Sequence, residues 1–230
     1  MDLTRREFLA YTAGAAGLMG LAIHKPATAG PLTQQSRPWY MVYSDPNTYD
    51  SESMRGYWSA LPDEWRIRPE PAPPTPVPLL IVPYCMWLFP NIADSLRNAL
   101  RESGTTVLME TGAGFANHTT FRQHRRWMRE TFGIHIAAPV ELRGKRTSAN
   151  APYIEFTWPC RAMIRDFSRV VPPADRSEGD VIAWAGDLAV ATRRRVGKGW
   201  LIYLGSPVGT ALWAGDVEAR RWLHAVAHAA

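Results

Sequence analysis

The stretch that decides the fold runs from Leu79 to Gly114 and reads LLIVPYCMWLFPNIADSLRNALRESGTTVLMETGAG. Its first four residues are all apolar, which is typical of a parallel strand that is buried on both faces. Apolar residues then recur at helical spacing from Ile92 to Leu100, and Gly104 is suited to a left-handed helix stop. A second predicted buried strand covers Thr105–Met109. The stretch therefore predicts two parallel strands joined by a crossover helix.

Flanking segments extend this pattern in both directions. Residues 39–43 predict a strand, and a helix follows that Asp50 or Ser51 can cap. Near the other end, two strands meet at Gly197-Lys198-Gly199, and Asp216 can cap a last helix. We therefore expect an α/β domain with a doubly wound, mostly parallel sheet, helices on both faces and an antiparallel hairpin near the C-terminus.

Length and charge limit the function classes. The 230 residues are enough for one α/β domain with a sizeable core, and the composition of 46% hydrophobic and 20% charged residues is that of a folded protein. The formal net charge is +5. Without a basic stripe or a nucleic-acid motif, this mild excess does not indicate a nucleic-acid partner.

The N-terminus carries an export pattern. The paired Arg5 and Arg6 lie in TRREFL, which resembles the twin-arginine motif, and an apolar segment follows over residues 10–23. Ala27 and Ala29 fit the small-x-small cleavage rule. We expect export to the periplasmic side of the cytoplasmic membrane, with the segment either cleaved or retained as an anchor.

These signals divide the chain into three parts. Residues 1–29 are the signal or membrane anchor, residues 30–38 are a polar spacer, and residues 39–230 are the α/β domain. The cysteines Cys85 and Cys160 either form one disulfide after export or remain two buried thiols. No nucleotide, haem or metal motif is present in the sequence, so we expect no cofactor and no metal site.

Three pieces of sequence share features of one family. They are the stretch Leu79–Gly114, RRRVGKGWLIYLGSP at 193–207 and DVEARRWLHAVAHA at 216–229. Together they resemble a class I glutamine amidotransferase-like (flavodoxin-like) domain, as in β-galactosidase trimerisation modules and uncharacterised exported proteins. The family's Gly-x-Cys-x-Gly elbow reads Leu108-Met109-Glu110-Thr111-Gly112 here. Because a carboxylate cannot replace the thiolate, the resemblance implies a domain without amidotransferase activity.

Other polar residues follow the predicted strands. Ligands of a doubly wound sheet bind beyond the carboxyl ends of its strands, where we expect Cys85, Glu110 and His118. They form either a hydrolytic site, with Glu110 as acid or base and His118 as its partner, or a set of loop anchors and a buried thiol.

Two surfaces are candidates for contact with a partner. The apolar loop of Met86, Trp87, Leu88 and Phe89 either forms an interface or covers the end of the sheet. Basic residues gather on one side of a predicted helix from Thr120 to Thr131. They include Arg125, Arg126 and Arg129, and form either a solvated face or a contact with anionic lipid or an acidic partner.

Two functional hypotheses follow. The first is a non-catalytic binding or accessory subunit that docks on the outer face of a membrane-associated respiratory, photosynthetic or transport complex. The alternative is a periplasmic hydrolase or carbohydrate-handling enzyme that uses the crevice around Glu110 and His118.

Overall fold

The computed structural model describes residues 40–42, 51–61, 77–111, 117–142, 153–165, 169–174 and 179–230. All of them belong to the compact unit that runs from Pro38 to Ala230. The predicted export signal, with Arg5, Arg6, Ala27 and Ala29, lies outside the described residues.

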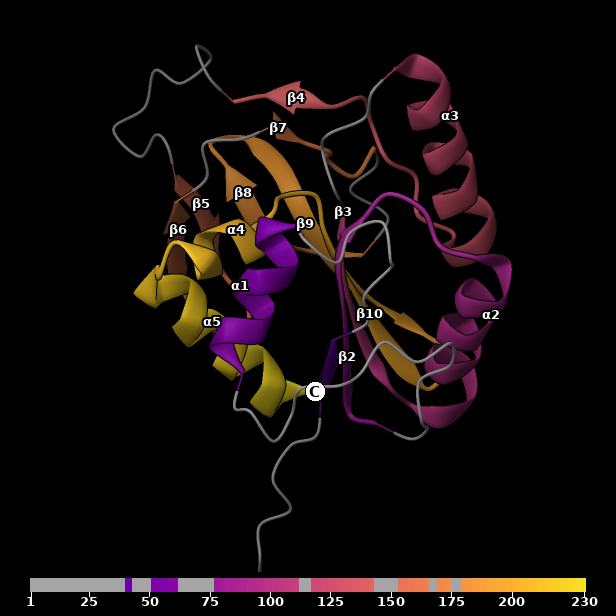
Figure 1. The fold of residues 1–230 in the computed structure, drawn as a ribbon, viewed down its shortest axis with the longest axis horizontal. Helices are drawn as coiled ribbons and strands as arrows, with labels where there is room; N and C mark the ends of the chain where they lie inside the picture. Colours follow the sequence, from indigo (N-terminus) through magenta and orange to yellow (C-terminus); the bar gives the residue numbers. More distant parts are fainter. Residues whose placement is uncertain are drawn as a thin grey trace, which may run out of the picture. The chain divides into compact units, whose positions relative to one another are not determined.

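One eight-stranded sheet organises this unit (Figure 1). Its strands lie in the order β1-β2-β3-β10-β9-β8-β5-β6. Their bounds, in that order, are Tyr40–Val42, Leu79–Cys85, Thr106–Thr111, Gly199–Leu204, Leu188–Val196, Asp180–Ala185, Tyr153–Phe156 and Ala162–Arg165. A separate two-stranded sheet pairs β4 (Val140–Glu141) with β7 (Arg169–Val170).

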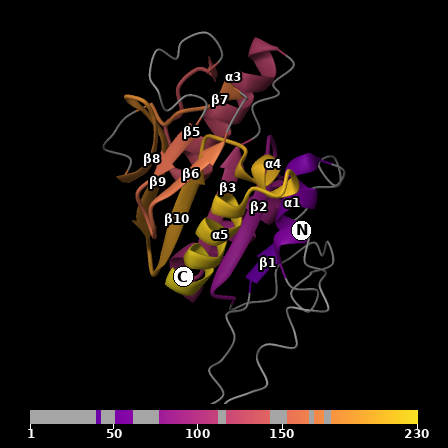
Figure 2. The ribbon, with the colours of Figure 1, turned by 90° about the vertical axis from the view of Figure 1, so that its left-hand side faces the viewer.

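The prediction of a doubly wound, mostly parallel sheet is wrong. The pairs β1–β2, β2–β3 and β3–β10 are parallel, whereas β10–β9, β9–β8, β8–β5 and β5–β6 are antiparallel, so the sheet is mixed. It curls strongly across its width (Figure 2). The antiparallel half of the sheet arises from short turns between its strands. Besides the predicted turn at Gly197, a second turn at Gly186 joins β8 to β9, and both glycines have φ of 61°. Such turns leave no room for a crossover helix, so the strands on either side run antiparallel.

The predicted strand-helix-strand unit is confirmed inside this mixed sheet. β2 and β3 are parallel neighbours in a register that pairs Leu79 with Thr106 and Val82 with Met109. Between them lie α2 (Pro90–Asn98) and a π-helical turn η2 (Ala99–Ser103). Gly104 ends the helix in the left-handed conformation, with φ of 75°.

Helices cover both faces of the parallel half of the sheet. α1 (Glu52–Ala60), α4 (Val208–Trp213) and α5 (Val217–Ala229) lie on one side, and α2 and α3 (His118–Trp127) lie on the other (Figure 1). α3 continues as the π-helical turn η3 (Met128–Phe132). Because side chains alternate along β3, Leu108 joins the core under α1, whereas Val107 and Met109 join the core under α2 and α3.

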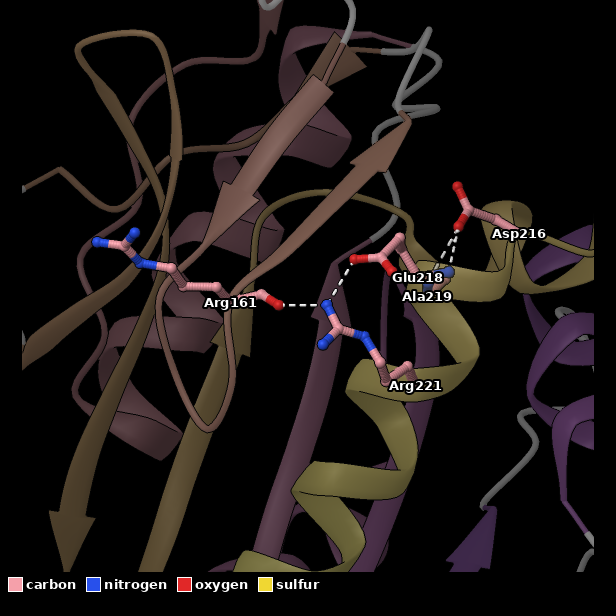
Figure 3. Close-up of polar contacts among 5 residues, drawn as sticks. All are labelled: Arg161, Asp216, Glu218, Ala219 and Arg221. Atoms are coloured by element: carbon pink, nitrogen blue, oxygen red, sulfur yellow. Dashed lines mark hydrogen bonds and ion pairs between the residues drawn. The ribbon is translucent and has the colours of Figure 1, made fainter.

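The start of α5 is held by polar contacts (Figure 3). The Asp216 carboxylate accepts from the backbone N–H groups of Glu218 at 2.8 Å and Ala219 at 3.1 Å, as its predicted capping role requires. Arg221 donates to the Glu218 carboxylate at 2.6 Å and to the Arg161 carbonyl at 2.5 Å. These bonds connect the exposed side of α5 to the segment before β6.

α1 and α4 approach each other backbone to backbone. A Cβ atom at Gly56 would lie 1.7 Å from the carbonyl oxygen of Gly209, and a Cβ atom at Gly209 would lie 2.0 Å from Ser53 Oγ. Only glycine fits at either position. This close contact places the start of α4 beside α1 and over the end of β3.

Candidate functional site

Glu110 is a wholly buried carboxylate near the end of β3. The Ser53 hydroxyl donates to its Oε1, and the Tyr57 hydroxyl donates to its Oε2 at 2.9 Å. The Gly209 backbone N–H donates to Oε2 at 2.8 Å, and the Tyr84 backbone also bonds the carboxylate. Each oxygen of Glu110 is therefore occupied by donors from the protein.

Three local features of the chain bring these donors together. Ser53 and Tyr57 lie four residues apart, on the same face of α1, whose N-terminus Ser51 caps. The missing side chain of Gly209 allows its N–H to reach the carboxylate. Tyr84 has φ of 46° within an irregular part of β2, so its backbone is turned out of the regular strand geometry.

Burial controls the protonation of this site. It raises the pKa of Glu110 from the usual 4.5 to about 7, although the bonds from Ser53, Gly209, Tyr57 and Tyr84 act in the opposite direction. Burial, followed by the negative charge of Glu110, also raises the pKa of Tyr57 well above 10.0. Tyr57 therefore remains a protonated donor, while Glu110 titrates near neutral pH.

The raised pKa of Glu110 predicts a pH-dependent stability. Between pH 4.5 and 7, folded Glu110 keeps a proton that the unfolded chain has released. The stabilisation is therefore complete below pH 4.5 and is lost as the pH rises through 7, a change on the order of 3 kcal/mol. We expect urea denaturation to show this fall in the free energy of unfolding, measured relative to Glu110→Gln at each pH.

Glu110→Gln is the matched reference because it keeps the shape of the side chain and does not titrate. Other groups with shifted pKa values, including His124, cancel in the difference between the two proteins. A difference that stays constant from pH 4.5 to 8 would show that Glu110 has an ordinary pKa.

The structure does not bring Glu110, His118 and Cys85 together. Glu110 points toward α1, whereas Cys85 is buried in the core on the other face of the sheet. His118 is the exposed first residue of α3, which covers that same other face. The sheet separates the carboxylate from both partners, because neighbouring residues of a strand point to opposite faces. Cys85 and Cys160 do not form a disulfide with each other.

The loop after β2 is anchored on α3. Leu88 is buried, but Trp87 and Phe89 expose 45% and 49% of their surfaces. The Met86 carbonyl accepts a bond at 2.9 Å from His124 Nδ1, which therefore carries the proton. Burial lowers the pKa of His124 to about 4, so this histidine is neutral at physiological pH. Only part of the predicted apolar loop is thus available to a ligand.

Trp87 and Trp127 form the wall of a surface groove, here called the tryptophan groove. Their ring centroids lie 6.3 Å apart, with 40° between the ring planes. Phe132 packs edge-on against Trp127, with 5.3 Å between the ring centroids, and holds this indole ring in place. The groove has a volume of about 500 Å³, and its other lining residues are Gln123, Arg126 and Glu130.

A second hollow lies on the same helix and is here called the arginine hollow. It has a volume of about 330 Å³ and shares Arg126 with the tryptophan groove. Glu130 accepts from Arg126 at 2.9 Å and lies 3.9 Å from Arg129. The residues that line the hollow are Arg122, Arg125, Arg126, Arg129 and His135.

Some residues of these sites were not predicted from sequence. Arg125 and Arg126 were predicted as a basic surface, but the spacing of Arg122 from Arg125 and Arg129 on the same helix also places it there. Ser53 and Gly209 were missed as partners of Glu110. The available signal was Glu110 itself, because a carboxylate in an otherwise buried strand requires hydrogen-bond donors. Among the described residues, no three His, Cys, Asp or Glu side chains are grouped to hold a metal ion.

Comparison with known proteins places the fold. No protein-family model and no curated protein sequence matches the chain. An exo-β-1,4-mannosidase, Op5Man5 from Opitutaceae bacterium strain TAV5, matches with a TM-score of 0.56 and 15% identity over 84% of this chain and 36% of that one. The chain shares its fold with part of a glycosidase.

Two β-galactosidase structures give the same result. The enzyme from Rahnella sp. R3 has a TM-score of 0.54 and 12% identity over 84% of this chain and 31% of that one. The enzyme from Bacillus circulans sp. alkalophilus has a TM-score of 0.50 and 13% identity over 82% and 31%. The chain thus spans about a third of the length of the solved structures that it matches.

These matches correct two expectations. The resemblance to a class I glutamine amidotransferase-like, flavodoxin-like domain is not supported, because the matching structures are glycosidases and the sheet is mixed. In this chain the quoted motifs form a strand-helix-strand unit and a glycine turn, which are local features and do not specify a family. The interpretation as an accessory subunit of a membrane complex is not supported either, because the solved structures that the chain matches are glycosidases. Within the described part of the chain, no helix has the length and apolar character to cross a bilayer.

Proposed function

We propose that this chain is a carbohydrate-handling protein that recognises a glycan at the tryptophan groove. The observation that carries the proposal is the pair of indole rings of Trp87 and Trp127, which open onto polar side chains. A sugar ring has an apolar C–H face and a rim of hydroxyl groups. The negative π-face of an indole ring complements the apolar C–H face of the sugar. Amide, guanidinium and carboxylate groups form hydrogen bonds with its hydroxyl groups.

The size and rigidity of the tryptophan groove support this proposal. Its volume of about 500 Å³ lies within the range of roughly 300–1,000 Å³ that small-ligand sites occupy. Its wall is held in place on both sides, since His124 bonds the loop that carries Trp87 and Phe132 packs against Trp127. A preorganised wall loses little conformational entropy when a ligand binds.

The fold comparison points in the same direction. The mannosidase and the two β-galactosidases act on glycosides, as their names state. Because this chain spans about a third of their length, we propose for it the handling of carbohydrate and not the complete reaction of any of them.

Bond cleavage at Glu110 is not part of this proposal. Most glycosidases use two carboxyl groups that flank the glycosidic bond, about 5–9.5 Å apart. Glu110 is wholly buried and its oxygens are bonded to Ser53, Tyr57 and Gly209, so it does not reach a sugar. Among the described residues, the groove itself is lined by one carboxylate, Glu130.

Replacing Trp87 with alanine should weaken glycan binding about tenfold, because one face of the sugar ring loses its stacking partner. Titration calorimetry with β-1,4-mannohexaose, a β-galacto-oligosaccharide and an acidic oligosaccharide of the same length would measure the change. Assays for released reducing sugar on the same panel would detect hydrolysis.

Trp213→Ala is the matched control, since Trp213 is exposed to 50% on α4, away from the groove. It should bind as the wild-type protein does. The proposal fails if the wild-type protein binds no glycan in the panel, or if Trp87→Ala binds as tightly as Trp213→Ala.

Location in the cell remains a separate prediction. Export by the twin-arginine route depends on residues 1–29, which lie outside the described part of the chain. An exported protein of this kind would meet its glycan in the periplasm.

A further inference from the structure

We infer that the glycan is acidic and that its carboxylate or sulfate groups bind in the arginine hollow. This inference rests on the proposed function, because it names the class of glycan that the tryptophan groove would take. The two sites are continuous through Arg126, which lines both of them. A sugar ring that stacks in the groove would therefore direct a neighbouring unit of the chain along α3 and into the hollow.

The charge of the hollow is the first argument. Four arginines line it, and Glu130 lies close to two of them, which leaves a formal excess of 4 − 1 = +3 without counting His135. Arg122 and Arg125 form no ion pair with a carboxylate in the part of the chain that the structure describes. Like charges repel at this spacing, so an anion in the hollow would relieve an unfavourable arrangement.

The chemistry and spacing of the arginines are the second argument. A guanidinium group presents a planar fork of N–H donors, which matches the two oxygens of a carboxylate or sulfate. Arg122, Arg125 and Arg129 recur at i, i+3 and i+7, so they form one row along α3 and η3. A row of cations fits a polymer that carries an anion on successive units. A neutral mannan or galactan would leave Arg122 and Arg125 without an anionic partner among the described residues.

Binding of charged and neutral oligosaccharides of equal length tests the inference. The probes are an oligogalacturonate, which carries carboxylates, a sulfated galacto-oligosaccharide, and β-1,4-mannohexaose as the neutral member. We expect at least one acidic probe to bind tenfold or more tightly than the neutral one at 50 mM salt. The difference in affinity between the acidic and the neutral probe should decrease as salt is raised to 500 mM, because salt screens exposed charges.

The double variant Arg122→Gln/Arg125→Gln should reduce the affinity for the acidic probe about tenfold and leave the neutral probe unchanged. These two arginines are chosen because their removal separates no ion pair with Glu130. Arg161→Gln/Arg220→Gln is the matched control with the same change in net charge. Its residues lie before β6 and on α5, and the Arg161 side chain points away from Arg221 (Figure 3). This control should bind both probes as the wild-type protein does.

The outcomes separate this inference from the proposed function. If acidic and neutral probes bind equally well, the inference is wrong and glycan recognition stands. If no oligosaccharide binds, both fail. Polyphosphate and vesicles that contain anionic lipid serve as anions without sugar. If either binds as tightly as the acidic oligosaccharide and Trp87→Ala weakens none of them, the hollow is a general anionic contact, and the inference is overturned.

Discussion

Gly56→Ala should remove more than about 3 kcal/mol from the free energy of unfolding, and the variant should be largely insoluble. The added Cβ atom would lie 1.7 Å from the Gly209 carbonyl oxygen and 2.8 Å from the Trp213 backbone nitrogen. Both are backbone atoms, so α1 and α4 would have to separate, which is the costly form of overpacking. At an exposed helical position the same substitution would stabilise by roughly 0.5–1 kcal/mol. A decrease in stability on Gly56→Ala, in place of an increase, would therefore show that the two helices are in contact.

Urea denaturation followed by circular dichroism measures this effect, with Gly186→Ala as the control. Gly186 has φ of 61° but no atom within 4 Å of an added Cβ, so this variant should lose only about 1–2 kcal/mol from backbone strain. A Gly56→Ala protein that is as stable as the wild type would show that α1 and α4 do not touch as described.

Glu110→Ala is the second substitution with a large expected effect. It leaves the Ser53 hydroxyl, the Tyr57 hydroxyl and the Gly209 N–H buried without their acceptor. Since each orphaned group costs about 1–3 kcal/mol, we expect a loss of about 4 kcal/mol at pH 6. Glu110→Gln should lose less, about 1–2 kcal/mol, because the amide oxygen still accepts from Tyr57 and Gly209 and the Ser53 hydroxyl can accept from the amide nitrogen.

The exposed Glu102→Ala is the control and should change stability by less than about 0.5 kcal/mol. Chemical denaturation of all three variants, combined with the glycoside assays, distinguishes a structural from a catalytic role. A Glu110→Ala protein that is as stable as Glu102→Ala, yet has lost a measurable hydrolytic activity, would show that Glu110 acts on substrate.

The surroundings of Glu110 explain how the fold accommodates a buried carboxylate. The strand that carries Glu110 is buried along its whole length, and the carboxylate lies between the sheet and two helices. Such a group is tolerated only when the protein supplies donors for it. Its bonds in turn connect α1, β3 and the start of α4, so the site also specifies how these elements pack. The exposed face of α3 is under no such constraint and is available for a ligand.

Local elements of the fold could be predicted from the sequence. The apolar run that begins at Leu79, the stop at Gly104, the turn after Val196 and the cap at Asp216 are all found in the structure. Each depends on residues within a few positions of one another, where periodicity, capping and turn chemistry act. The hairpin of β9 and β10 was predicted, but the antiparallel direction of β8, β5 and β6 was not, because it depends on how successive strands add to one edge of the sheet.

The sequence by itself determined the central strand-helix-strand unit, the turn after Val196 and the cap of the last helix, and it marked Glu110 and Trp87 as candidate site residues. Only the tertiary structure decided what surrounds them. The donors to Glu110 come from Ser53 and Gly209, which lie 57 and 99 positions away in the chain, and Trp87 meets Trp127 from a different element. Contacts between distant residues form when whole elements pack, so they leave no pattern in the neighbouring sequence.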